Sequence, residues 1–223
     1  MKFTHCLANA LQKNEGVLGF TKEVETARVP MWIPGLRKIT KIVCGTNHVL
    51  ALDKDQKVWA WGNGQQNQLG RRLTERTMRE SLVPTHVGFS DPDVKKPSKR
   101  IIDIACGDYH GFALADDGHV WSWGVNNYGE TGIPEGAGTD NASVTRPTIV
   151  QSLDAYEVAT IDGGSHHNVV VLGDGRCLAW GRCDGAALGI PLENINEEDV
   201  LKDDNGKWKV LMTPTIIPGE FNQ

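Results

Sequence analysis

The chain has 223 residues, 39% of them hydrophobic, so it is long enough to bury the core of one or two domains. It contains no run of about 18 apolar residues, and this excludes a transmembrane helix on sequence grounds. Its formal net charge of −5 gives no electrostatic footprint for wrapping nucleic acid directly.

The first 30 residues are expected to form a partial unit with a turn in it. Asn14, Glu15 and Gly16, within "LQKNEGVL" at 11–18, are typical of a tight turn in a polar, protruding hairpin. On the residues alone, an ordinary surface turn remains an alternative to a functional segment.

The next stretch, "CGTNHVLALDKDQKVWAWG" at 44–62, occurs three times in the chain. It returns without gaps at 106–124 and 163–181, spaced 62 and 57 residues apart. A long repeat period of this kind is typical of solenoids and propellers. Each copy has a glycine three residues before a histidine, and then a Trp-Gly pair. These residues are Gly45, His48, Trp61 and Gly62; Gly107, His110, Trp123 and Gly124; and Gly164, His167, Trp180 and Gly181.

Each copy predicts two short strands joined by a tight turn. Asp-Gly pairs at 117–118 and 174–175 favour a two-residue type I′ turn, in which both central residues have positive φ. The first copy has Gln56 where the others have glycine. We therefore expect strain of up to about 1 kcal/mol there, or a different turn type.

Two further strands flank each hairpin. One precedes it, in "KITKIVCG", "RIIDIACG" and "EVATIDGG", and one follows a proline at Pro84, Pro147 or Pro214. Four short strands per unit of roughly 55 to 60 residues, with little helix signal, predict a propeller blade. The predicted fold class is all-β, an incomplete β-propeller arc of about three to four blades. The predicted division is a partial blade at 1–30, blades at 31–84, 85–147 and 148–213, and the first strand of a next blade at 214–223.

The repeated residues have structural explanations. Alternation places Trp59 and Trp61 on one face, where their rings fill the space between blades. The repeated glycines indicate close backbone approach. One histidine per blade at one position favours ring nitrogens bonded to loop backbone over a metal site. Five cysteines without a C-x-x-C pair argue against a disulfide framework or zinc site. No cofactor and no metal are expected.

Three segments between the repeats vary freely and are expected to be loops that carry partner specificity. They are "RRLTERTMRESLV", "SDPDVKKPSKR" and "ENINEEDVLKDDNGKW". The second contains a basic cluster, Lys95, Lys96, Lys99 and Arg100, which is best explained as solvated surface, with contact to phosphate or to an acidic patch as the alternative. The acidic run at 193–204 is also best explained as solvated surface, with contact to histone tails as the alternative.

From about Asn14 onward the chain resembles the regulator of chromosome condensation repeats, the propeller that acts as guanine nucleotide exchange factor for the small GTPase Ran. The resemblance rests on the "GxxH", "WG" and "LG" motifs and the proline after them. That propeller has seven blades, so this chain resembles a piece of a ring. The resemblance is to a fungal-type or other non-animal member. Position 47 departs from the acidic residue of animal relatives, which leaves a hydrogen-bonding role there in place of an electrostatic one.

The resemblance also implies where function lies. Residues Leu11, Gln12, Lys13, Asn14, Glu15, Gly16, Val17 and Leu18 correspond to a wedge that enters the GTPase. Asn47, Tyr109 and His166, each directly before a repeat histidine, correspond to GTPase-facing loops. Exchange changes no covalent bond, so no catalytic residue is expected and the chain is not expected to be an enzyme.

The implied partners are Ran and, for the full-length protein, histones or the nucleosome, with no small-molecule substrate and no membrane. The implied location is the nucleus, on chromatin, with the cytoplasm left open. The rival interpretation is a generic propeller scaffold for protein interactions, as in ubiquitin ligases or membrane-traffic regulators. The wedge segment with its "GVLGF" continuation favours exchange, because a scaffold has no need of it.

Overall fold

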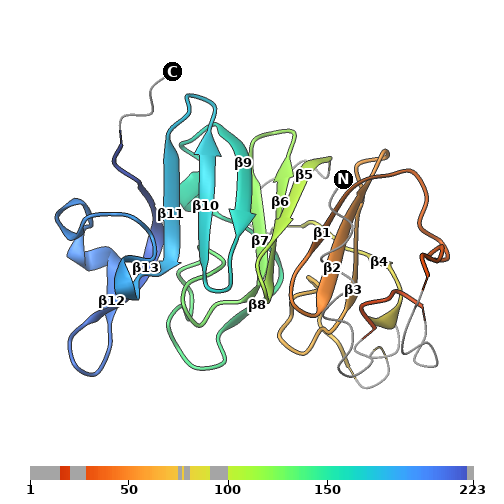
Figure 1. The fold of residues 1–223 in the computed structure, drawn as a ribbon, viewed down its shortest axis with the longest axis horizontal. Coiled ribbons are helices and arrows are strands. Elements are labelled where there is room, and N and C mark those ends of the chain that lie inside the picture. Colours follow the sequence, from red (N-terminus) through yellow and green to blue (C-terminus); the bar gives the residue numbers. More distant parts are fainter. Residues whose placement is uncertain (1–15, 21–28, 75–76, 78–80, 91–99, 220–223) are drawn as a thin grey trace.

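A computed structural model describes residues 16–20, 29–74, 77, 81–90 and 100–219, and its strands form three antiparallel sheets (Figure 1). In these ranges no helix has the length and apolar character needed to cross a membrane. The three sheets, with no helix longer than a single 3₁₀ turn among the described residues, confirm the expected all-β architecture.

The first two sheets have four strands each, in the orders β1-β2-β3-β4 and β5-β6-β7-β8. Their bounds are β1 Ile39–Cys44, β2 His48–Asp53, β3 Val58–Gly62, β4 Thr85–His86, β5 Ile101–Cys106, β6 His110–Ala115, β7 Val120–Val125 and β8 Ser143–Ile149.

The third sheet has five strands, in the order β12-β13-β11-β10-β9. Their bounds are β9 Val158–Gly163, β10 His167–Leu172, β11 Cys177–Arg182, β12 Val200–Lys202 and β13 Trp208–Ile216. Four single-turn 3₁₀ helices are described, η2 Gln151–Leu153, η3 Asp184–Ala186, η4 Leu192–Asn194 and η5 Glu197–Asp199.

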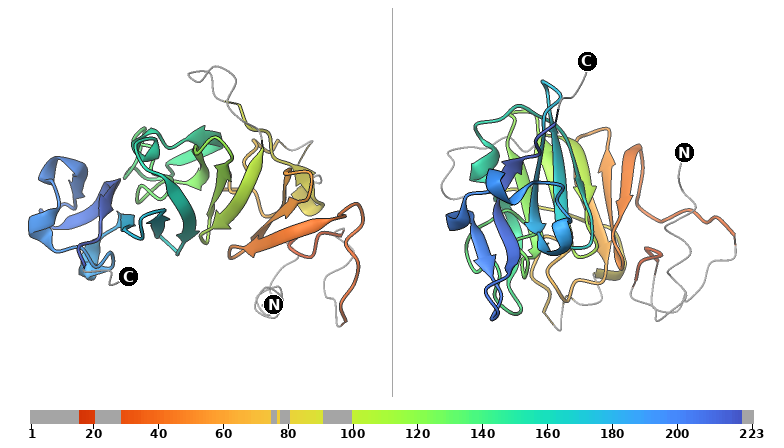
Figure 2. Two further views of the ribbon diagram at one scale, coloured as in Figure 1. Left: turned by 90° about the horizontal axis from the view of Figure 1, so that it is seen from above. Right: turned by 60° about the vertical axis from the view of Figure 1, so that its left-hand side comes forward.

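The sheets stand side by side in chain order, with the first strand of each on the same side (Figures 1 and 2). Strand β1 contacts β5, and β5 contacts β9. These three strands are the inner strands of the arc. An ion pair of 2.5 Å between Lys41 Nζ of β1 and Asp103 Oδ1 of β5 links two of them. The arrangement is that of neighbouring propeller blades around a common axis.

Hydrophobic side chains fill the spaces between the sheets. Trp121 and Trp123 lie between the first and second sheets, in one cluster with Leu50 and Leu69. Trp180 lies with Phe112 between the second and third sheets. The corresponding pair of the first copy, Trp59 and Trp61, shares a cluster with Val17 on the other face of the first sheet. The alternation predicted for the tryptophans is confirmed.

The hairpin turns differ from the predicted type I′ turn. Only the third residue of each three-residue loop has positive φ, namely Gln56 (62°), Gly118 (90°) and Gly175 (87°). The amide of this residue donates to the carbonyl of Asp53, Ala115 or Leu172. This is a type I turn followed by a left-handed residue. The prediction was wrong because an Asp-Gly pair suits both loops.

The sheets also divide the chain later than the predicted boundaries. The strand after each proline is paired within its own sheet: β4 with β3, β8 with β7, and β13 with β11. The predicted blade ends at 84, 147 and 213 thus fall directly before β4, inside β8 and inside β13. The segment 214–223, predicted as the first strand of a next blade, overlaps β13. The expected loop "ENINEEDVLKDDNGKW" instead contributes β12 and the start of β13 to the third sheet.

The described cysteines include one departure from expectation. Cys44 is disulfide-bonded, whereas Cys106, at the same position of the second copy, is a free, buried thiol. Burial raises the pKa of the Cys106 thiol far above its ordinary value.

Candidate protein-binding face

The residue before each repeat histidine is held by the same backbone contact. The carbonyl oxygens of Asn47, Tyr109 and His166 accept hydrogen bonds of 2.7, 3.0 and 2.7 Å from the amides of the residues that follow the Trp-Gly pairs. In all three copies a Cβ on the glycine of that pair would collide with this carbonyl oxygen. The glycine therefore allows the loop to lie directly on the strand.

The three loops lie next to one another along the inner side of the arc. The amide of Thr46 donates to the carbonyl of Asp108 (3.1 Å), and the amide of Asp108 donates to the carbonyl of Gly164 (3.2 Å). Asn47, Tyr109 and His166 are each partly exposed. The structure thus presents the three predicted GTPase-facing residues on successive loops of one face.

The repeat histidines themselves are not part of this surface. His48 and His110 have no exposed area, and His167 is half-buried. At His48 the ring lies against backbone groups of Asp108 and His110, in line with the expected contact to loop backbone, but His110 bonds differently. Nε2 of His110 lies 2.7 Å from Oδ1 of Asn168, a side chain of the next sheet.

His48 has no such side-chain partner. The residue of the second sheet that is equivalent to Asn168 of the third sheet is Gly111, which has no side chain to offer. Neither ring nitrogen of His48 makes a hydrogen bond of good geometry among the described residues, although backbone groups of Asp108 and His110 lie beside the ring. Desolvation, reinforced by the neighbouring His110, lowers the pKa of His48 to about 3. Desolvation also lowers the pKa of His110. Both rings are therefore neutral at physiological pH and serve as packing groups.

His166, next to buried His167, has a different environment on the surface. Its Nδ1 lies 2.9 Å from Oε1 of Glu130, a carboxylate with no exposed area. The other oxygen of Glu130 accepts the backbone amide of Tyr128 at 2.8 Å. The Tyr128 ring lies 4.7 Å from the His166 ring, centroid to centroid.

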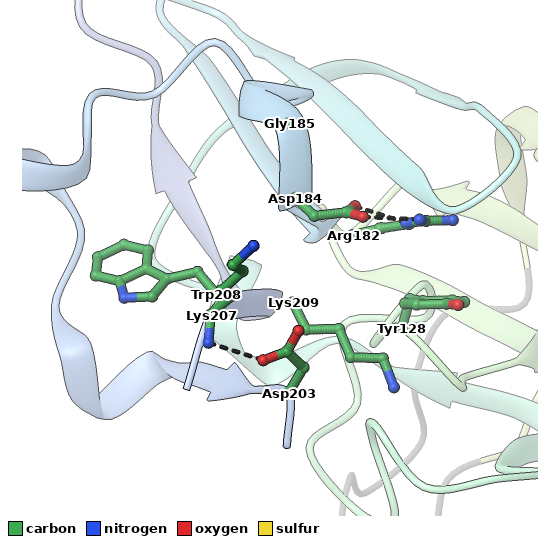
Figure 3. A pocket seen from close by; sticks show the side chains of 8 residues that line it. All are labelled: Tyr128, Arg182, Asp184, Gly185, Asp203, Lys207, Trp208 and Lys209. Carbon is green, nitrogen blue, oxygen red and sulfur yellow. Dashed lines mark hydrogen bonds and ion pairs between the residues drawn. The ribbon is translucent and has the colours of Figure 1, made fainter. Parts of the chain in front are cut away.

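A pocket of about 480 Å³ adjoins Tyr128 at the junction of the second and third sheets (Figure 3). The guanidinium of Arg182 lies 5.1 Å from the centroid of the Tyr128 ring, and Nζ of Lys209 lies 5.5 Å from it. Arg182 is also bonded to Asp184, at 2.6 and 2.7 Å. Three residues of its lining, Tyr128, Arg182 and Trp208, are of types that are enriched at protein interfaces.

Sequence reasoning missed Tyr128, Glu130 and Arg182. The signal available was the glutamate at 130, where the first copy has Gln68 at the same distance after the Trp-Gly pair. The spatial proximity of Glu130 to His166, 36 residues away, could not be read from the repeat.

The predicted wedge is described only at its end, because 11–15 lie outside the described residues. Gly16 is buried and has φ 79°, and a Cβ on it would collide with Leu82. The indole of Trp61 donates to the carbonyl of Val17 at 2.9 Å, as Trp123 does to Gln68 and Trp180 to Glu130. Residues 16–18 are thus anchored as the turn of a repeat. Leu18 is half-buried.

No group of three potential metal ligands occurs among the described side chains. The face is instead built from backbone-anchored loops with exposed polar and aromatic side chains, which suits a protein partner.

The fold is an arc of a β-propeller, and its loops present a candidate protein-binding surface. A family model described as an RCC1-like domain matches residues 6–222, so the chain belongs to this family. The predicted resemblance to the regulator of chromosome condensation is confirmed.

Two yeast proteins and one crystal structure are similar to most of the chain. Protein pim1 of Schizosaccharomyces pombe is 41% identical over 209 residues, and the guanine nucleotide exchange factor SRM1 of Saccharomyces cerevisiae is 36% identical over 207 residues. The matches cover 94% and 92% of the chain, but only 37% and 41% of these relatives. The chain therefore spans about two fifths of their length.

The crystal structure is that of Prp20p from Saccharomyces cerevisiae, which is described with its binding to Gsp1p and histones. It superposes with a TM-score of 0.79 at 34% identity, over 92% of this chain and 46% of that one. The likeness supports a propeller of which this chain forms a part.

Proposed function

We propose that this chain forms part of a nuclear, chromatin-associated guanine nucleotide exchange factor for the small GTPase Ran. The observation that carries the proposal is the 36% identity to a protein named as a guanine nucleotide exchange factor, over 92% of the chain. Its partners would be Ran and, as described for Prp20p, histones.

An exchange factor works by differential affinity. It binds the nucleotide-free GTPase more tightly than the loaded one and so promotes GDP release. Acceleration by about 10⁵ lowers the barrier to release by roughly 7 kcal/mol, which has to come from interface contacts. No nucleophile or general base takes part.

We assign those contacts to two parts of the chain. Asn47, Tyr109 and His166 contact the GTPase from the loop face, and Leu11–Leu18 enters it as a wedge. Glu15 brings a carboxylate toward the phosphate-binding loop, where it competes with anionic groups of the nucleotide. The anchoring of Val17 fixes the end of this segment, but the equivalent turns of the next two repeats have the same bond, so the wedge assignment rests on the resemblance.

The test is the release of fluorescent GDP from Ran. The chain is assayed as it is, and also as a completed ring, with residues 6–222 replacing the matching segment of Saccharomyces cerevisiae SRM1. Asn14→Ala with Glu15→Ala in the ring should slow release at least about tenfold, since the wedge contacts are lost. Gly16 stays unchanged because its side-chain position is filled by Leu82.

The matched control is Gln65→Ala with Gln66→Ala, two exposed residues at the equivalent place of the next repeat turn. This variant should exchange at the unmodified rate. Equal rates for both double variants would disprove the wedge assignment. A ring that binds other proteins but does not stimulate release would favour the scaffold alternative.

A further inference from the structure

Glu130 is a buried carboxylate with two hydrogen-bond partners of different kinds. Its Oε2 accepts the backbone amide of Tyr128, a bond that shapes the loop, at 2.8 Å. Its Oε1 lies 2.9 Å from Nδ1 of His166, whose side chain is 33% exposed. The first contact belongs to the turn itself, but the second reaches a residue of the binding face.

The preceding repeat shows that the turn needs only the first of these two contacts. Gln68 holds the same place in its repeat as Glu130. The backbone carbonyl of Gln68 accepts a hydrogen bond from the indole of Trp123, and that of Glu130 accepts one from the indole of Trp180. The side-chain oxygen of Gln68 accepts the amide of Gln66 at 2.9 Å, just as Glu130 accepts that of Tyr128. A glutamine therefore suffices for the turn, and a carboxylate has no advantage there.

What a carboxylate adds is a second acceptor. An ionised carboxylate has no proton to donate, so the facing ring nitrogen has to be the donor. His166 then carries its proton on Nδ1, and the unprotonated Nε2 becomes a hydrogen-bond acceptor. The Tyr128 ring, 4.7 Å from the imidazole and flanked by Arg182 and Lys209, restrains the ring from rotating.

We propose that Glu130 is a positioning residue that holds His166 as the Nδ1–H tautomer and presents Nε2 as an acceptor to an N–H or O–H donor of the partner protein. The identity of the partner rests on the proposed function, whereas the tautomer does not. The proposal gives the buried glutamate a role that the fold alone does not require.

The first test is imidazole ¹⁵N NMR on the chain at pH about 8.5, where neutral imidazoles predominate. The expected spectrum of His166 is that of the Nδ1–H tautomer. Glu130→Gln should invert it, because the glutamine oxygen stays on the Tyr128 amide, as in Gln68, and its NH₂ then faces Nδ1. An Nε2–H tautomer in the unmodified chain, or an unchanged tautomer in the variant, would overturn the proposal.

The second test uses exchange on Ran in the completed ring. Glu130→Gln should slow exchange about tenfold, because Nε2 of His166 then carries a proton and faces the N–H or O–H donor of Ran without a hydrogen bond. In a His166→Asn background the same change should have no further effect, whereas a merely structural role for Glu130 would add to the loss. Additive losses would overturn the positioning role.

The two readouts also separate this proposal from the proposed function. If Glu130→Gln inverts the tautomer and leaves exchange unchanged, the tautomer assignment holds and the presentation of Nε2 to Ran fails. The unfolding midpoint of the variant should stay near that of the unmodified chain, in keeping with the glutamine at position 68.

Discussion

Gln56 occupies a backbone conformation that suits glycine. Its φ is 62°, and the equivalent residues of the two other repeat turns are Gly118 and Gly175. The side chain has a partial compensation, since its Oε1 accepts a 2.9 Å hydrogen bond from Nε of Arg100. That bond is exposed, so its contribution is smaller than the cost of the left-handed backbone, which is about 1 kcal/mol.

Gln56→Gly should therefore stabilise the chain by about 0.5 to 1 kcal/mol. The measurement is the free energy of unfolding from urea denaturation. The control is Gly118→Ala, where an added Cβ meets no atom within 4 Å, so only backbone strain is introduced. It should lose about 1 kcal/mol. A less stable Gln56→Gly variant would show that the Arg100 contact outweighs the strain.

The buried repeat histidines predict a dependence of stability on pH. The folded-state pKa of His48 is about 3, below the 6.5 of the unfolded chain. Below pH 6.5 the unfolded state therefore binds a proton that the folded state does not. Stability is full above pH 6.5 and falls as the pH decreases toward 3.

From pH 7.5 to 5.5, His48 alone should lower the free energy of unfolding by about 1.4 kcal/mol. Urea denaturation at both pH values measures the loss. In His48→Gln this loss should be smaller by that amount, whatever the variant's stability at pH 7.5. An identical pH dependence in both proteins would show that His48 becomes protonated in the folded state.

At the scale of the strands and turns, a single loop design recurs four times. The β12–β13 hairpin has the same three-residue turn as the repeat hairpins, with Gly206 at φ 74°. Its Asp203 accepts the amides of Asn205 and Lys207, as Asp53 accepts those of Asp55 and Lys57. The short aspartate thus organises the loop in both a repeat hairpin and an insertion.

The hydrogen bonds of this loop also lower the pKa of Asp53. Partial burial opposes ionisation, but hydrogen bonds from the Lys57 amide, the Trp59 indole and the Asp55 amide outweigh it. They hold the pKa of the Asp53 carboxyl below its ordinary value. This contribution to stability is present above the unfolded pKa and is lost as the pH falls through the folded one.

These elements show what the sequence could and could not predict. The hairpin strands followed from alternation, because the large side chains at alternate positions of β3, β7 and β11 lie on one face of each strand. The turn type did not, since an Asp-Gly pair satisfies both a two-residue and a three-residue loop. The β12–β13 hairpin was missed because its polar, acidic sequence resembles a solvated loop, and its pairing partner β11 belongs to the repeat.

For the candidate site, the repeat predicted which residues share a structural position but not what touches them. The neighbours of His166 come from a loop 36 residues away, and the Glu130 contact depends on how two sheets pack. Asn47, Tyr109 and His166 could be chosen from the resemblance. Their place on successive loops follows from the inner strands lying side by side.

Across the whole molecule, the indoles join each sheet to the repeat before it. Trp123 of the second sheet donates to the carbonyl of Gln68, which follows the first sheet's hairpin, at 3.0 Å. Trp59, in contrast, donates within its own sheet, to Oδ2 of Asp53 at 2.9 Å. Stability in such arrays is roughly a sum of unit and interface terms, so the two tryptophans should affect different parts of the molecule.

Trp123→Phe should lower the free energy of unfolding by about 1 to 3 kcal/mol, because a buried carbonyl loses its donor and the smaller ring leaves space. Amide hydrogen exchange should show lost protection in both β2–β3 and β6–β7, since the weakened interface serves both sheets. Trp59→Phe should reduce protection mainly in β2–β3. Loss confined to the second sheet in Trp123→Phe would mean that each sheet is stable independently of its neighbour, and that the contacts between sheets contribute little to holding the arc together.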